Sequence, residues 1–243
     1  MNMITEIKHR LIRKVSEGLP VGILLFGWRL LTLLGGPISR KALEERDRIP
    51  VALTDGSGGL RTGAELCRAV QKGQTYIENQ PELSDIPFGT HPKSNLASSG
   101  CEIIAAYNYC LYKGRTCSLA GLIRYFELHG ASLRGAFGLE PRSLYRFLRR
   151  HFPKLRYCYG RKAENAVYAG TPEAAVVTVQ NDRENLFAMI HTVCITKEEQ
   201  GYVIHNGGRK NREGAWSPSE GYRTFRDAVA HITESPRLLA VIL

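Results

Sequence analysis

Four residues between positions 95 and 206 have the types and the order that nucleophilic catalysis requires. They are one cysteine, one histidine and two asparagines: Asn95, Cys101, His191 and Asn206. A thiol nucleophile needs a base that takes its proton, and the base needs a partner that fixes its ring. The attacked carbonyl needs a hydrogen-bond donor for its oxygen. The set therefore predicts attack of Cys101 on an amide or thioester carbonyl, with an acyl-enzyme that water or an amine resolves.

Cys101 is distinguished from the other cysteines by its local sequence. It follows a short Ser-Ser-Gly turn and precedes a run of good helix formers. This context predicts a thiol at a helix N-terminus, where free N–H groups and the helix dipole favour the thiolate. The backbone N–H of Cys101 is expected to donate to the oxyanion, together with the side-chain amide of Asn95. Asn95 has a second interpretation, in which it only starts a turn with Ser94.

His191 is the predicted general base among the seven histidines. It lies in an apolar, β-branched run, so its ring must find a polar partner. Asn206 follows the next predicted strand and is expected to accept from the imidazole N–H. His205 is the alternative base, but strand alternation puts His205 and Asn206 on opposite faces of the sheet.

The cysteines and histidines show no metal-binding pattern. No C-x-x-C pair occurs, and Cys194 and His191, three positions apart on a predicted strand, face opposite sides. The sequence therefore predicts neither a metal nor a cofactor. Six cysteines in 243 residues are too few for a disulfide scaffold, so reduced thiols in the cytoplasm are expected.

These residues must be positioned by two kinds of element. Helical patterns are predicted at 63–71, 101–113, 118–130, 141–152 and 222–233. Strand patterns are predicted at 174–180, 187–196, 201–205 and 238–243. A helical half followed by a sheet half predicts an α+β architecture with two layers that meet at a cleft.

The order Asn95, Cys101, His191, Asn206 resembles the papain-like cysteine peptidase superfamily. The runs Ser-Gly-Cys-Glu-Ile-Ile-Ala-Ala-Tyr-Asn, Gly-Ala-Phe-Gly-Leu-Glu-Pro and Met-Ile-His-Thr-Val are most similar to the bacterial branch of bacteriocin-processing, double-glycine leader peptidases. The resemblance implies a helical half led by the Cys101 helix, an antiparallel sheet half that carries His191 and Asn206, and a peptide or protein substrate. It covers 83–243 and leaves 1–82 as an N-terminal extension.

Two positions depart from that superfamily pattern. Asn95 stands where the superfamily has a glutamine, and Glu102 replaces a small residue next to the cysteine. A carboxylate within a few ångströms of the sulfur opposes thiolate formation. A catalytically inactive binding or scaffold protein of the same fold is therefore the alternative function.

The remaining features concern the N-terminal segment and the net charge of +10. A basic stretch at 8–14 leads into an apolar run at 21–34 that contains Arg29. This run is interpreted as a helix that packs on the domain or lies in a membrane interface with Arg29 snorkelling to the polar side; a signal peptide or anchor at 8–36 stays open. With the basic stretch Arg142 to Arg150, it predicts contact with an anionic membrane surface. Nucleic acid is not expected as a partner, since no nucleic-acid-binding motif accompanies the charge.

Overall fold

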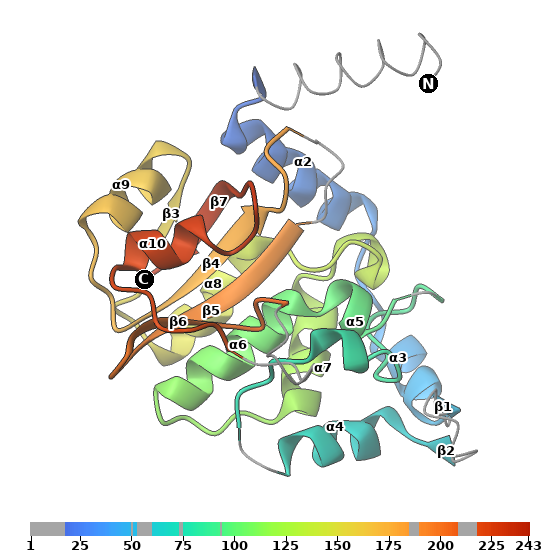
Figure 1. Ribbon diagram of the computed structural model, residues 1–243. Helices are drawn as coiled ribbons and strands as arrows, with labels where there is room; N and C mark the ends of the chain where they lie inside the picture. The colour runs from blue at the N-terminus through green and yellow to red at the C-terminus, as the bar shows by residue number, and fades with distance from the viewer. Residues whose placement is uncertain are drawn as a thin grey trace, which may run out of the picture.

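The computed structural model describes seven stretches of the 243-residue chain and shows an α+β fold (Figure 1). The described residues are 18–49, 51–52, 60–72, 75–92, 94–184, 190–208 and 218–243. The helices are α2 (Val21–Leu34), α3 (Arg40–Asp47), α4 (Gly63–Gln71), α5 (Leu96–Ser99), α6 (Cys101–Tyr112), α7 (Leu119–His129), α8 (Pro141–His151), α9 (Arg161–Ala169) and α10 (Phe225–Ala230), with short 3-10 turns η1 (Gln80–Glu82) and η2 (Ser132–Gly135).

The strands form a small ribbon and one main sheet. Strands β1 (Val51–Ala52) and β2 (Leu60–Arg61) pair only with each other, whereas the main sheet has the order β3-β7-β4-β5-β6. Its members are β3 (Tyr157–Tyr159), β4 (Ala174–Gln180), β5 (Ile190–Glu198), β6 (Gly201–His205) and β7 (Arg237–Ile242). Every neighbouring pair in the main sheet is antiparallel.

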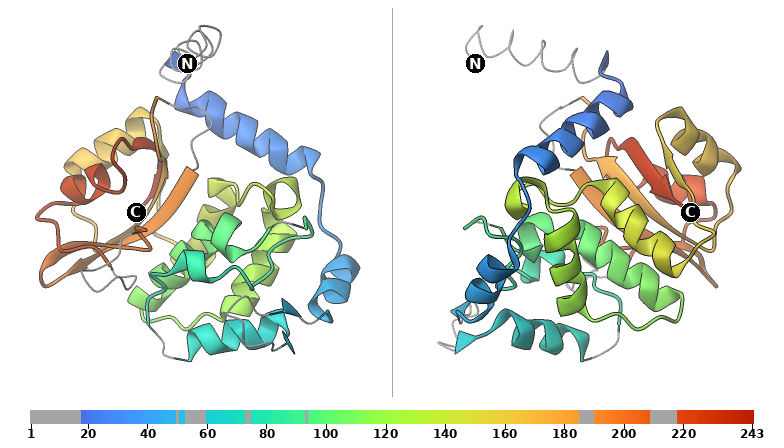
Figure 2. Two further views of the ribbon diagram at one scale, coloured as in Figure 1. Left: turned by 45° about the vertical axis from the view of Figure 1, so that its right-hand side comes forward. Right: turned by 180° about the vertical axis from the view of Figure 1, so that it is seen from behind.

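Helices cover both faces of the main sheet, as Figures 1 and 2 show. All seven residues of β4 are buried, in keeping with the run of apolar and β-branched residues that precedes Gln180. Alternate residues belong to two cores: Val176 and Cys194 pack with the helices on the α6 side, while Val177 and Val193 pack under α9 and α10. The sheet is therefore the shared wall between two hydrophobic cores.

Helix α6 is the central element of the helical half. Its first ten residues, 101–110, are all buried, so it is apolar on nearly every side rather than amphipathic. It packs along β5 and also contacts α7 and α8. This packing fixes the N-terminus of α6 against the strand that carries His191.

The predicted α+β class is confirmed, and most predicted elements occur close to their expected bounds. The sequence prediction at 222–233 was too long, since α10 spans only Phe225–Ala230. Elements α3, α5, α9, β1, β2 and β3 were not predicted. The first residues of the strand expected at 187–196 lie outside the described residues.

The core does not change at the boundary expected near residue 82. Ile38, Leu43, Cys67 and Ile77 pack into the same cluster as Ile103 of α6. Residues on both sides of that boundary therefore share one core.

The apolar N-terminal run forms helix α2, as one of the interpretations expected. Its buried residues Leu25 and Trp28 pack with Leu239 and with Ile190, the neighbour of His191. None of the helices in the described part of the chain is both long and apolar enough to cross a membrane. Residues 8–17, which carry the basic stretch, lie outside the described residues.

Candidate active site

Cys101 is the first residue of α6, which follows α5 after the single residue Gly100. A side chain at Gly100 would meet the Leu96 carbonyl oxygen at 2.6 Å, so only glycine fits this junction without movement. The Cys101 side chain is 7% exposed. The tight junction thus places the thiol at the buried N-terminus of the central helix, as the sequence predicted.

The sulfur of Cys101 contacts a carboxyl group and a strand residue. The thiol donates to Glu102 Oε2 over 3.3 Å. The backbone N–H and the side chain of Thr192, the residue after His191, also form hydrogen bonds with the sulfur and favour its charged form. Burial and the neighbouring Glu102 carboxylate outweigh these bonds and raise the pKa of the Cys101 thiol well above its usual value. The thiol is therefore protonated in this structure.

Glu102 is buried beside the thiol rather than turned away from it. Glu102 is only 1% exposed. Its carboxyl group lies against Gly138, because a Cβ added there would be 3.3 and 3.4 Å from the two carboxyl oxygens. Burial raises the pKa of Glu102 to about 7, although N–H groups of Glu102 and Leu139 donate to the carboxylate. Near neutral pH the carboxyl group therefore exists in both protonation states.

The His191 ring is held by Asn206, but through the backbone rather than the side chain. His191 Nε2 lies 2.7 Å from the Asn206 carbonyl oxygen. Because a carbonyl oxygen only accepts, Nε2 carries a proton, and in the neutral ring Nδ1 keeps its lone pair. Burial lowers the pKa of His191, so this neutral tautomer predominates at neutral pH.

The Asn206 side chain is turned toward another residue, Gln80. Asn206 Nδ2 donates to Gln80 Oε1 over 2.8 Å, and Gln80 Nε2 donates to the carbonyl oxygens of Leu96 and Ala97, each over 3.1 Å. Gln80 is 8% exposed. It therefore ties the end of β6 to α5, immediately before Cys101.

A second contact from the same segment fixes the Asn206 backbone. Glu78 Oε2 accepts from the Asn206 N–H over 2.5 Å, and Glu78 Oε1 lies 2.6 Å from His205 Nδ1. Asn206 has a φ of 59°, a left-handed conformation that asparagine tolerates better than most residues. The segment around Glu78 and Gln80 thereby holds the carbonyl group that meets His191.

His205, the alternative base, belongs to a different and buried network. Its Nε2 lies 2.7 Å from Thr196 Oγ1, and its ring stacks on Tyr76 with 3.8 Å between centroids. His205 pairs in register with Cys194, so it faces α6, whereas Ile204 faces the other core. Both ring nitrogens are engaged, so His205 fits a structural role better than that of a base.

Asn95 caps α5 in this structure. Its Oδ1 accepts from the Ser98 N–H over 2.9 Å, and Ser98 Oγ accepts from the Asn95 N–H over 3.2 Å. These reciprocal bonds form a capping box with Ser98, whereas the sequence prediction for a structural role was a turn with Ser94.

The structure brings three of the four predicted residues to one end of β5 but does not join the thiol to the imidazole. Among the described residues, Cys101 and His191 form no hydrogen bond with each other; the sulfur contacts Thr192 instead. Strand alternation directs Thr192 toward α6 and His191 toward the opposite face. In this structure the His191 ring and the Cys101 sulfur therefore belong to opposite faces of β5.

Sequence reasoning missed Glu78, Gln80 and Thr192. The position of Thr192 could have been predicted, because side chains alternate along a strand and the neighbour of His191 then faces the helices. Glu78 and Gln80 lie in an irregular segment with no periodicity, so no sequence signal connects them with Asn206, more than 120 positions away.

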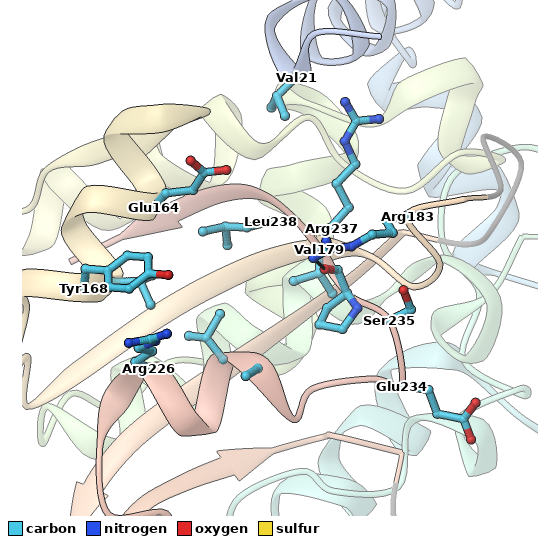
Figure 3. A pocket seen from close by; sticks show the side chains of 14 residues that line it. Val21, Glu164, Tyr168, Val179, Arg183, Arg226, Glu234, Ser235, Arg237 and Leu238 are labelled. Atoms are coloured by element: carbon cyan, nitrogen blue, oxygen red, sulfur yellow. Dashed lines mark hydrogen bonds between the residues drawn. The ribbon is translucent and has the colours of Figure 1, made fainter. Parts of the chain in front are cut away.

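A cavity of about 1090 Å³ lies between α9, α10 and β7 (Figure 3), and one of its lining residues is Val179, the cross-strand partner of His191. Its cationic side chains are already used: Arg226 stacks on Tyr168 at 4.3 Å, and Arg183 donates to the Pro236 carbonyl. No predicted site residue lines this cavity. Within the described part of the chain, no group of His, Cys, Asp and Glu side chains suits a metal ion.

Comparisons of the chain with protein-family models, with curated proteins and with solved structures gave no match. The class that can be stated is therefore an α+β protein with a five-stranded antiparallel sheet against its central helix.

Proposed function

We propose that this chain is a papain-like cysteine hydrolase that acts on a peptide or protein amide. The observation that carries the proposal is the position of Cys101 at the N-terminus of α6, against the strand whose His191 is held by Asn206. The tautomer that Asn206 imposes leaves His191 Nδ1 as a proton acceptor. The order Asn95, Cys101, His191, Asn206 along the chain fits this class of site. The pairing of β5, which carries His191, with β6, which precedes Asn206, also fits it.

In the proposed reaction, His191 Nδ1 takes the proton of the Cys101 thiol and the sulfur attacks the substrate carbonyl carbon. The backbone N–H of Cys101 donates to the developing oxyanion, with the Asn95 amide as second donor. The tetrahedral intermediate collapses, the amine leaves with the proton from His191, and an acyl-enzyme remains. His191 then takes a proton from water, and the resulting attack releases the acid and the free thiol.

Catalysis must start from a protonated Cys101 thiol that donates a hydrogen bond to Glu102. Proton transfer from Cys101 to His191 creates an ion pair without net charge, so it costs less than ionising the thiol alone in the same buried site. Approach of the His191 ring to the sulfur is the required movement. We place Cys101, His191 and Asn206 as the reacting and orienting residues, and Asn95 as the oxyanion donor.

The test is alkylation of Cys101 by iodoacetamide between pH 6 and 9, followed for all six cysteines by mass spectrometry. An active pair makes Cys101 alkylation depend on His191, so His191→Ala slows it by at least about tenfold at pH 7.5 while Cys117 and Cys158 react unchanged. His151→Phe is the matched control, because this histidine is the last residue of α8 and belongs to none of the hydrogen bonds around Cys101 and His191. Equal rates in the wild type and a folded His191→Ala variant would reject the hydrolase.

The second candidate is a binding or scaffold protein with the same fold, favoured by the hydrogen bond from the thiol to Glu102. Such a protein has no use for a thiolate, and its Cys101→Ala variant keeps its partner. The alkylation experiment separates the two, since a scaffold gives a Cys101 rate independent of His191.

A further inference from the structure

Helix α2 presents a second, exposed apolar face besides the one that packs on the domain. Five large side chains on it are strongly exposed: Ile23 53%, Phe26 67%, Leu30 44%, Leu33 67% and Leu34 71%. At about 100° per residue these positions fall within about 100° of arc, on the side opposite Leu25 and Trp28. The exposed stripe is thus continuous and is not a fringe of the packed face.

The concentration of exposed apolar surface on one helix is unusual. Of the other exposed large apolar residues in the described part, Ile49, Tyr159 and Tyr168 lie on other parts of the chain, and Phe137 contacts Trp28 of α2 edge-on. Scattered exposed side chains are ordinary in a folded protein, whereas a contiguous stripe signals a binding surface. The helix lies along the outside of the molecule, where Figures 1 and 2 show it crossing above the sheet and the helical half.

A cationic side chain, that of Arg29, borders this stripe. Arg29 is exposed and lies three positions after Phe26, so the two side chains are neighbours on the helix surface. No acidic residue occurs in α2. Arg29 and Leu33 also line a groove of about 300 Å³ with Arg146 of α8, whose guanidinium forms an ion pair with Glu140 over 3.4 Å. The chain that enters α2 contains Lys8, Arg10, Arg13 and Lys14, and the whole chain has a charge of +10.

We infer that the outer face of α2 docks on an anionic lipid surface, with its axis in the membrane plane. The apolar stripe enters the boundary between headgroups and acyl chains, and Arg29 meets the lipid phosphates. Charge selects the lipid over a second copy of this chain, because two copies with the same strong positive charge repel each other. Docking uses side chains that face away from the candidate active site, so this inference does not depend on the proposed hydrolase.

The test is flotation of the full-length protein with vesicles of neutral phosphatidylcholine, alone or with about one third phosphatidylglycerol. The wild type floats with the anionic vesicles at low salt and loses at least about tenfold in partitioning at 0.5 M NaCl or with neutral lipid. Replacement of Phe26 and Leu33 by serine lowers partitioning by at least about tenfold. Tyr168→Ser, at an equally exposed site on α9, leaves it unchanged.

Three outcomes would overturn the inference. They are no flotation of the wild type, equal flotation with neutral and anionic vesicles, and unchanged flotation of the doubly substituted variant. Light scattering after size-exclusion chromatography supplies the remaining outcome: a dimer that the same two substitutions dissociate, without vesicle binding by the wild type, would assign the stripe to self-association.

Discussion

Glu102 is the residue that most directly controls the chemistry of Cys101. Its carboxylate faces the sulfur within a buried site, where the effective dielectric constant is low and a nearby negative charge opposes a second one strongly. A small uncharged residue at this position would impose no such opposition. Burial raises the pKa of the Cys101 thiol most, and the charge of Glu102 raises this pKa further.

Replacement of Glu102 by glutamine is expected to accelerate alkylation of Cys101. The substitution removes the negative charge that raises the Cys101 pKa and keeps a side chain of similar size. We expect at least about a tenfold faster reaction at pH 8, equivalent to about one pKa unit. Glu164→Gln on α9 is the control. An unchanged rate would mean that burial alone suppresses the thiolate.

The same carboxyl group predicts how stability changes with pH. Its folded pKa of about 7 lies above the usual value of 4.5, so the folded state binds more protons than the unfolded state between these limits. The contribution of Glu102 is fully present below about pH 4.5 and is lost as pH rises through about 7. Urea titrations at pH 5 and pH 8 should show wild-type stability decreasing relative to Glu102→Gln by on the order of 2 to 3 kcal/mol. Parallel pH profiles for the two proteins would contradict this.

At the scale of elements, the candidate site depends on how short segments are joined. Gly100 allows α5 to run into α6 with no intervening loop, and Gln80 ties that junction to the end of β6. The close approach of Gly100 to the Leu96 backbone and the hydrogen bonds of Gln80 both leave little room for a different side chain. Substitutions there report on the junction itself.

Gly100→Ala is expected to destabilise the protein by about 1 to 3 kcal/mol. The new Cβ would clash with Leu96 backbone atoms, at 2.6 Å from the carbonyl oxygen and 2.8 Å from Cα. Gly27→Ala in α2 is the matched control, because its Cβ meets nothing within 4 Å, and alanine there should be neutral or stabilise by up to about 1 kcal/mol. Equal effects of the two substitutions on the midpoint of urea unfolding would contradict the close contact between position 100 and the Leu96 backbone.

Gln80→Ala should also destabilise, by about 1 to 3 kcal/mol. It leaves the carbonyl groups of Leu96 and Ala97 and the Asn206 amide without their partner. Gln71→Ala, which removes one bond to the Cys117 carbonyl at a less buried place, is the control and should cost less. Hydrogen exchange should show lost protection at the end of β6 in Gln80→Ala only; uniform loss would indicate a general effect.

At the scale of the whole molecule, the main sheet joins two cores into one cooperative unit. Strands β4 and β5 contribute alternate side chains to both, so a disturbance on either face should weaken the same unfolding transition. Helix α2 differs, because its cluster of Leu25, Trp28 and Leu239 is separate from these two cores. We therefore expect α2 to detach from the sheet in a local unfolding event, at a lower free energy than global unfolding.

This division can be measured with two cavity-creating substitutions. Ile104→Ala, in the fully buried centre of α6, should lower global stability by about 2 to 5 kcal/mol. Trp28→Ala should instead reduce hydrogen-exchange protection within α2 and leave the exchange of β4 and β5 nearly unchanged. A global loss in Trp28→Ala as large as in Ile104→Ala would show that α2 is part of the main cooperative unit.

The sequence by itself determined the long periodic elements and the class of fold. Helices α4, α6, α7 and α8 and strands β4 and β6 have patterns that local propensity and burial impose, so their predicted bounds agree with the structure to within two residues. The helix-start position of Cys101 also followed from local sequence, since a Ser-Ser-Gly turn before helix formers needs no distant contact.

Only the tertiary structure decided what surrounds the thiol and the imidazole. Glu102 faces the sulfur because α6 is buried on nearly every side, so the usual choice of turning a charged side chain to solvent does not exist there. The partner of His191 is a backbone carbonyl because Glu78 and Gln80, more than 120 positions earlier, hold Asn206 in a left-handed conformation. Such contacts join irregular segments far apart in the chain, and no period or local propensity encodes them.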